Sequence, residues 1–173
     1  MRFAVRRVGN WVAFSRLQKN LTRELYKAYE QCLRRWALKA EGIAKMHIST
    51  QDLAGSYWAP LSPYTVLKKA LAGNSPNTLV ETSAYFQSIT SWVSMANGAA
   101  YVGVKRTAKY PKGTKSGYSS IAEVAKIQEY GSLAAGIPAR PLWQPTFEET
   151  MKWHIQFNMP GRLFLNAIRQ RYS

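Results

Sequence analysis

Apolar residues recur every three or four positions from residue 11 to residue 45. The stripe consists of Leu17, Leu21, Leu25, Ala28, Cys32, Trp36, Ala40 and Ile43. This spacing places the apolar side chains on one face of an α-helix, on the order of 50 Å long at 1.5 Å per residue. The cations Lys19, Arg23, Lys27 and Arg34 fall outside the stripe. Such a helix either packs against another subunit or is a core helix with a solvated basic face, and both interpretations stay open.

Capping signals predict three further helices. The first spans residues 62–73, because a serine cap, a proline at the first helical position and a closing glycine occur in that order. A Thr-x-x-Glu capping box opens the second helix, over residues 78–89. A Ser-x-x-Glu box opens the third, over residues 120–130, and Gly131 follows it.

Between these helices, residues 90–105 predict a β-hairpin. The pair Asn97-Gly98 is preferred in two-residue type I′ loops. Such a loop places Val93 opposite Val102. One face would then carry Val93, Met95, Ala100, Val102 and Val104, and the other Trp92, Ser94 and Tyr101.

The C-terminal third predicts a strand and a helix. Residues 137–143 contain two prolines and suggest a short edge strand. Pro145 can begin a helix with Glu148 and Glu149 in its first turn, where the helix dipole favours acids, and residues 160–161 (Pro-Gly) break it. The whole pattern predicts an α+β fold in which a small antiparallel β-sheet with a central hairpin is packed by several helices.

Composition adds a strong charge to this picture. The 173 residues suit one domain and contain 24 Lys+Arg against 9 Asp+Glu, which gives a net charge of +15. Such an excess implies a polyanionic partner, either nucleic acid or an anionic membrane surface. The longest uncharged run, residues 82–104, is too polar to cross a bilayer, so no membrane partner is expected.

A cluster of cations without acids follows the predicted hairpin. It contains Lys105, Arg106, Lys109, Lys112 and Lys115. On an exposed loop these side chains could contact phosphates without reading bases. The alternative is a solvated loop with no partner.

Catalytic and metal-binding patterns are missing from the sequence. There is no glycine-rich phosphate loop, no His-Glu-x-x-His and no Gly-x-Ser-x-Gly. The acids are scattered, His47 and His154 lie far apart, and the single cysteine, Cys32, excludes an intramolecular disulfide. We therefore expect a protein that is not an enzyme, with no metal and no cofactor.

Four segments together resemble a known family. They are residues 58–65 (WAPLSPYT), 79–89 (LVETSAYFQSI), 127–131 (IQEYG) and 137–143 (IPARPLW). In this order and spacing they resemble the virion morphogenesis proteins of tailed bacteriophages, which complete the tail or form the neck. Two positions depart from the family pattern, which usually has Gly at Ser83 and Phe at Leu142. The resemblance marks residues 55–150 as a family-like core, between a basic N-terminal helix (1–45) and a basic helical tail (151–173).

The resemblance implies a structural role at the head–tail junction of a virion. Proteins of this kind form rings, so we expect a homo-oligomer, a hexamer or alternatively a dodecamer. Its partners would be the connector or head-closure proteins, the tail tube or tail terminator protein, and genomic DNA passing through the ring without sequence specificity. The protein would reside in the virion, and in the host cytoplasm during assembly. The rival interpretation is a non-specific nucleic-acid-binding protein, and a small nuclease is a third.

Eight residues of these segments are candidates for an interface or an internal clasp. They are Trp58, Glu129, Tyr130, Gly131, Pro138, Arg140, Pro141 and Trp143. The two prolines stiffen an extended chain, and an arginine can bind a carboxylate through two parallel hydrogen bonds. We expect Glu129 to be the partner of Arg140. Whether the segment contacts a neighbour or closes on its own chain stays open.

Overall fold

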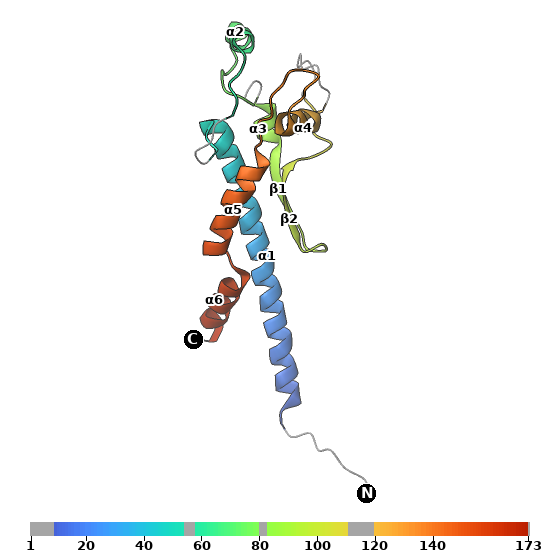
Figure 1. Ribbon diagram of the computed structural model, residues 1–173. Helices are drawn as coiled ribbons and strands as arrows, with labels where there is room; N and C mark the ends of the chain where they lie inside the picture. Colours follow the sequence, from blue (N-terminus) through green and yellow to red (C-terminus); the bar gives the residue numbers. More distant parts are fainter. Residues whose placement is uncertain (1–8, 54–57, 80–82, 111–119, 173) are drawn as a thin grey trace.

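A single long helix, α1 (Trp11–Thr50), is the spine of an elongated molecule (Figure 1). The computed structural model describes residues 9–53, 58–79, 83–110 and 120–172. The side chain of Asn10 caps α1 by accepting from the backbone N–H of Ala13 at 3.0 Å. The predicted helix is thus confirmed, and it continues five residues past the expected end because Ala44, His47 and Ile48 are buried.

Other elements pack along both sides of α1 (Figure 1). The strands β1 (Ile89–Ser94) and β2 (Ala99–Val104) form an antiparallel hairpin on one side. The helices α5 (Trp143–Phe157) and α6 (Pro160–Tyr172) lie on the other. All four contact α1. The described residues therefore have the predicted α+β fold.

The hairpin is confirmed, but its predicted turn is wrong. Val93 pairs with Ala100 rather than with Val102, so the loop has four residues, 95–98. Within this loop only Gly98 has a positive φ, 59°, whereas a type I′ turn needs two such residues. The shift is by two positions, which leaves the strand residues on their predicted faces, whereas Met95 lies in the loop. Trp92 and Tyr101 accordingly stack, with ring centroids 5.3 Å apart.

Three short helices occur at one end of the molecule, and two of their caps differ from expectation (Figure 1). The helix α2 (Pro63–Leu71) begins as predicted, with the Ser62 hydroxyl accepting from the Thr65 N–H. The helix α3 (Ala84–Ser88) starts six residues later than predicted, because the backbone of Thr78 is hydrogen-bonded to the Gln51 side chain. Glu81 lies outside the described residues. The helix α4 (Ile121–Tyr130) is present without a side-chain cap from Ser120.

The segment before α5 is not a strand. Ile137 makes a single bridge to Ser132, and helix α5 already begins at Trp143. Glu148 and Glu149 therefore lie in the second turn, so their predicted role at the helix start is wrong. The break at Pro160 is confirmed, since α5 ends at Phe157 and α6 begins at Pro160.

The hydrophobic core lies at the C-terminal end of α1. It consists of Ala44, Ile48, Leu53, Trp58, Tyr85, Ile89, Ile121 and Leu142. These residues come from α1, the segment between α1 and α2, α3, β1, α4 and the segment before α5. The N-terminal half of α1 is outside this core and extends beyond α6 (Figure 1).

Candidate assembly interface

Arg140 is buried and binds backbone carbonyls rather than a carboxylate. Its guanidinium donates to the Ala59 oxygen at 3.1 Å and to the Pro60 oxygen at 3.3 Å, and more weakly to the Gln128 side chain at 3.4 Å. Only 5% of the residue is exposed, and this burial lowers the pKa of Arg140. The predicted ion pair with Glu129 is therefore wrong. The guanidinium instead connects the carbonyls of residues 59–60 to the Gln128 side chain on α4.

Glu129 instead caps helix α5. Its carboxylate accepts from the Leu142 N–H at 2.8 Å and from the Trp143 N–H at 3.3 Å. The first backbone N–H groups of a helix lack partners within the helix, and the positive end of the helix dipole favours an acid there. A side chain on α4 thus satisfies the start of α5.

Two further contacts close this region on itself. The indole N–H of Trp58 donates to the Pro141 oxygen at 2.9 Å. A Cβ on Gly131, whose φ is +75°, would lie 2.8 Å from the Ala139 nitrogen. Residues 128–143 therefore form an internal clasp, which is one of the two interpretations that the sequence left open. Of the eight candidates, Tyr130, Pro138 and Pro141 have exposed side chains.

The basic loop is only partly described. Lys105, Arg106 and Lys109 are exposed, and Lys109 makes a backbone bridge to Ser120. Lys112 and Lys115 lie outside the described residues. Lys105, Arg106 and Lys109 form no ion pair with the described residues, so the structure does not assign this loop a partner.

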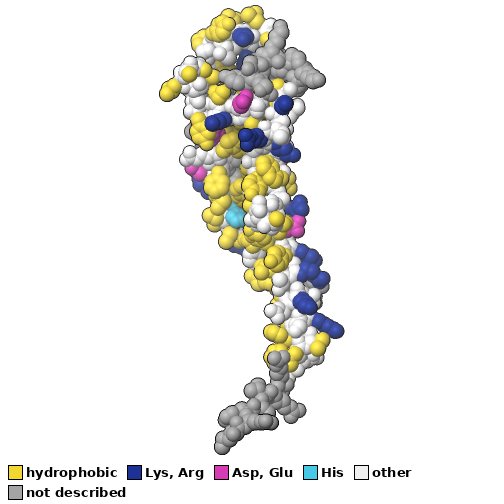
Figure 2. Space-filling view, turned by 90° about the vertical axis from the view of Figure 1, so that its right-hand side faces the viewer, with side chains coloured by type: hydrophobic (Ala, Val, Ile, Leu, Met, Phe, Trp, Pro, Cys, Tyr) yellow, Lys and Arg dark blue, Asp and Glu magenta, His cyan; other side chains and the backbone are white. Residues whose placement is uncertain are grey.

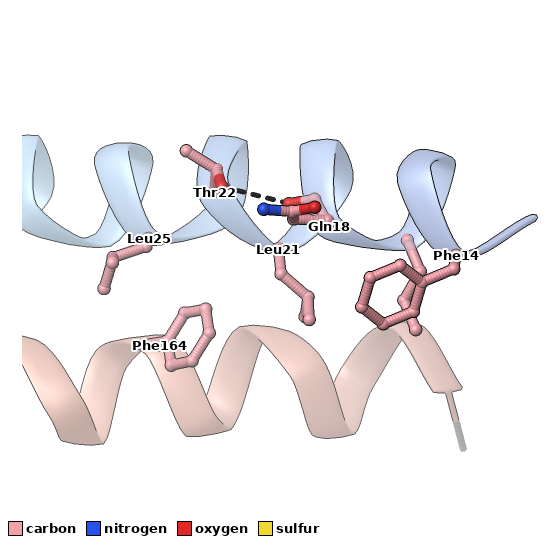
Figure 3. A pocket seen from close by; sticks show the side chains of 7 residues that line it. Phe14, Gln18, Leu21, Thr22, Leu25 and Phe164 are labelled. Carbon is pink, nitrogen blue, oxygen red and sulfur yellow. Dashed lines mark hydrogen bonds between the residues drawn. The ribbon is translucent and has the colours of Figure 1, made fainter. Parts of the chain in front are cut away.

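An apolar groove lies between the N-terminal half of α1 and α6 (Figure 3). It has a volume of about 260 Å³, and its lining consists of Phe14, Leu17, Gln18, Leu21, Thr22, Leu25 and Phe164. The side chains of Leu21 and Leu25 point toward α6, and the ring of Phe164 points toward α1 (Figure 3). The Thr22 hydroxyl donates to the Gln18 carbonyl at 3.0 Å, so the groove's polar rim is bonded within the helix. The stripe predicted from the sequence thus lines a groove, but its pairing with α6 could not be foreseen.

The groove continues into exposed hydrophobic side chains at the start of α1. Trp11 is 51% exposed and packs edge to face against Phe14, with ring centroids 6.1 Å apart. Leu17 and Leu25 are nearly half exposed. Contiguous apolar surface of this kind usually marks an interaction site.

One buried constellation has the residue types of a catalytic triad. The imidazole of His47 lies 3.2 Å from the Thr146 hydroxyl and 3.0 Å from a Glu149 carboxylate oxygen. His47 and Thr146 are each 1% exposed, and the Thr146 hydroxyl donates to the Leu142 carbonyl at 2.7 Å. A nucleophile must reach a substrate, so the buried Thr146 hydroxyl is not placed to act as one, and the cluster holds α1 against α5.

The side chain of Cys32 also makes a structural contact within the chain. The Cys32 thiol is buried and donates to the Asn158 carbonyl at 3.0 Å, and burial raises its pKa, which makes it less reactive. No group of three His, Cys, Asp or Glu side chains among the described residues could hold a metal ion. None of the helices, over the described part of the chain, is both long and apolar enough to cross a membrane.

Comparison with known proteins gives no further guide. No family model, curated protein or solved structure matches this chain.

Proposed function

We propose that the chain is a structural protein of a phage virion, located at the head–tail junction. It would form a ring that joins the connector to the tail tube and surrounds the DNA channel. The proposal rests on the resemblance of residues 55–150 to virion morphogenesis proteins and on one structural observation, the apolar groove of α1 and α6.

The groove supports the proposal of an assembly, because in an isolated chain its apolar side chains would be exposed to water. Four large apolar side chains of the groove and the start of α1, Trp11, Phe14, Leu17 and Leu25, are about half exposed. Its volume of 260 Å³ is below the roughly 300–1,000 Å³ typical of small-molecule sites, and it suits the side chains of another protein better than a metabolite. We assign it to the contact with a second copy in the ring.

The chemistry of the described residues is consistent with a structural role. The His47 cluster is closed to substrates, and the Cys32 thiol is buried. The clasp of residues 128–143 fixes the body of each subunit, which gives the ring a rigid building block.

Deletion of the gene in a phage that encodes it tests the proposal. Filled heads and complete tails should accumulate unjoined, and the wild-type gene should restore infectious particles. A Leu21→Glu variant, which puts a charge into the groove, should fail to restore them. Leu38→Glu is the matched control, because Leu38 is 66% exposed on the same helix and does not line the groove. Intact virions without the protein would contradict the proposal.

The net charge of +15 favours a second candidate, a non-specific nucleic-acid-binding protein. Tight duplex binding by an isolated monomer at physiological salt would support it. Weak binding by the monomer together with ring assembly would support the junction protein.

A further inference from the structure

The charges of α1 are distributed unevenly along its length. In the C-terminal part Glu30 pairs with Arg34 at 2.7 Å and Glu41 with Lys45 at 2.6 Å. The two remaining cations there, Arg35 and Lys39, each lie 5.9 Å from the centroid of the Trp153 ring. In the N-terminal part four cations, Arg16, Lys19, Arg23 and Lys27, share a single acid, Glu24. Glu24 lies 3.8 Å from Arg23 and 3.4 Å from Lys27. Three positive charges are therefore in excess on this half.

These four cations form a basic ridge on one face of the helix. Their spacing of three or four residues places them on one side of α1. All four are exposed, and Figure 2 shows Lys and Arg side chains along one edge of the lower part of the molecule. Leu17, Leu21 and Leu25 lie on the opposite face, toward α6.

This arrangement is unfavourable for the chain alone. Like charges four residues apart, as Lys19 and Arg23 or Arg23 and Lys27, destabilise a helix. Glu24 relieves the repulsion between Arg23 and Lys27, but among the described residues no acid is paired with Arg16 or Lys19. An external anion would stabilise the ridge instead.

We propose that the basic ridge binds the phosphodiester backbone of duplex DNA without sequence specificity. Contacts to phosphates need exposed Lys and Arg and no base-reading side chains. A protein partner suits Lys19 and Lys27 less well, because lysine is depleted in protein interfaces, although arginine is enriched there. A membrane surface is also less suited, since it would have to take up the apolar face, part of which α6 occupies.

The inference rests on the proposed function for its biological setting, because the proposed ring surrounds the DNA channel. It assigns a DNA contact to a helix, in addition to the candidate loop at residues 105–115.

Salt-dependent binding to labelled duplex DNA of two unrelated sequences tests the ridge. Each phosphate contact adds about 0.9 to the slope of log affinity against log salt. The triple variant Arg16→Gln, Lys19→Gln and Lys27→Gln should therefore reduce the slope by about 2.7 and weaken binding to both sequences alike. The matched control, Lys68→Gln, Lys126→Gln and Lys152→Gln, removes the same charge from exposed positions elsewhere and should reduce the slope by less than about 1.

A variant that gains binding excludes loss of folding as the cause. Glu24→Gln frees Arg23 and Lys27 from their shared acid, so it should tighten DNA binding and steepen the slope. Equal losses in the ridge and control variants would overturn the proposal. So would an unchanged slope in the ridge variant, or a loss of binding to anionic lipid vesicles with DNA binding intact.

The mass of the assembled protein separates this inference from the proposed function. The ridge variant should form the same oligomer as the wild type. If neither the wild type nor the variants form an oligomer, the proposed ring is wrong. The salt slopes would still show whether the basic ridge binds DNA.

Discussion

The carboxylate of Glu129 accepts the backbone N–H of Leu142 at 2.8 Å, so a side chain of α4 caps the first turn of α5. Trp143, the first residue of α5, donates to the same carboxylate. This contact joins the two ends of the clasp, and through α5 it fixes the clasp to α1.

Replacement of Glu129 by alanine should therefore destabilise the fold. It leaves two partly buried N–H groups without a charged acceptor, which costs about 1–3 kcal/mol. Urea unfolding followed by tryptophan fluorescence measures the loss. Glu123→Ala, an exposed acid on the same helix, is the control and should cost no more than about 1 kcal/mol. Equal effects of the two variants would show that the cap contributes nothing specific.

Gly131 makes a second prediction about the clasp. A Cβ at this position would lie 2.8 Å from the Ala139 nitrogen and 2.9 Å from the Ile137 oxygen, and φ is +75°. Gly131→Ala should therefore lower the free energy of unfolding by about 1–3 kcal/mol. Gly42→Ala is the opposite control: Gly42 lies within α1 with nothing within 4 Å of its Cβ position, and alanine there should stabilise by about 0.5–1 kcal/mol. A neutral Gly131→Ala would contradict the close packing of the clasp.

The lowered pKa of Glu41 predicts that the stability of the fold depends on pH. Burial by itself would raise the pKa of Glu41, but hydrogen bonds from Lys45 and Ser91, each 2.6 Å long, outweigh it, and the pKa lies below its ordinary value of 4.5. A lowered pKa in the folded state stabilises the protein above pH 4.5, and this contribution is lost as the pH falls through the folded pKa.

Ser91→Ala removes one of the two bonds that lower this pKa. The variant should be less stable than the wild type at pH 7 by about 1 kcal/mol, and the difference should shrink at pH 3. Urea unfolding at both values measures it. A difference that is the same at pH 7 and pH 3 would show that the Ser91 hydroxyl does not act through the ionised form of Glu41.

The basic loop stays a candidate for DNA contact beside the ridge. Simultaneous replacement of Lys105, Arg106, Lys109, Lys112 and Lys115 by glutamine should impair assembly or DNA retention. The thermal midpoint and the circular dichroism spectrum should be unchanged, because the three described members are exposed. If this variant unfolds, the loop is structural and its assignment is wrong.

The sequence predicted those elements that local pattern determines. The periodicity of α1, the Ser62-Pro63 start of α2 and the sorting of hairpin faces needed no knowledge of distant residues. The hairpin turn was missed because Gly98 has a distant partner: the Tyr29 hydroxyl donates to its carbonyl at 2.6 Å. The helix start predicted at Thr78 was wrong for the same reason, since the Gln51 side chain is hydrogen-bonded to the backbone N–H and carbonyl of Thr78.

The clasp shows a similar limit for side-chain partners. An arginine and a glutamate in neighbouring segments suggested an ion pair, but Arg140 binds the carbonyls of residues 59–60. Every residue has a carbonyl, so the sequence cannot indicate which of them accepts. The groove could not be predicted, because it forms only where α6 packs against α1, and no local sequence pattern indicates this contact.

The mass of the purified protein tests the central claim most directly. Native mass spectrometry at near-physiological ionic strength should give a closed oligomer, a hexamer or a dodecamer of the 19.6 kDa chain. Leu21→Glu should shift this species to the monomer, whereas Leu38→Glu should leave it intact. A wild-type protein that stays a 19.6 kDa monomer at all concentrations, and that is missing from purified virions, would contradict the account.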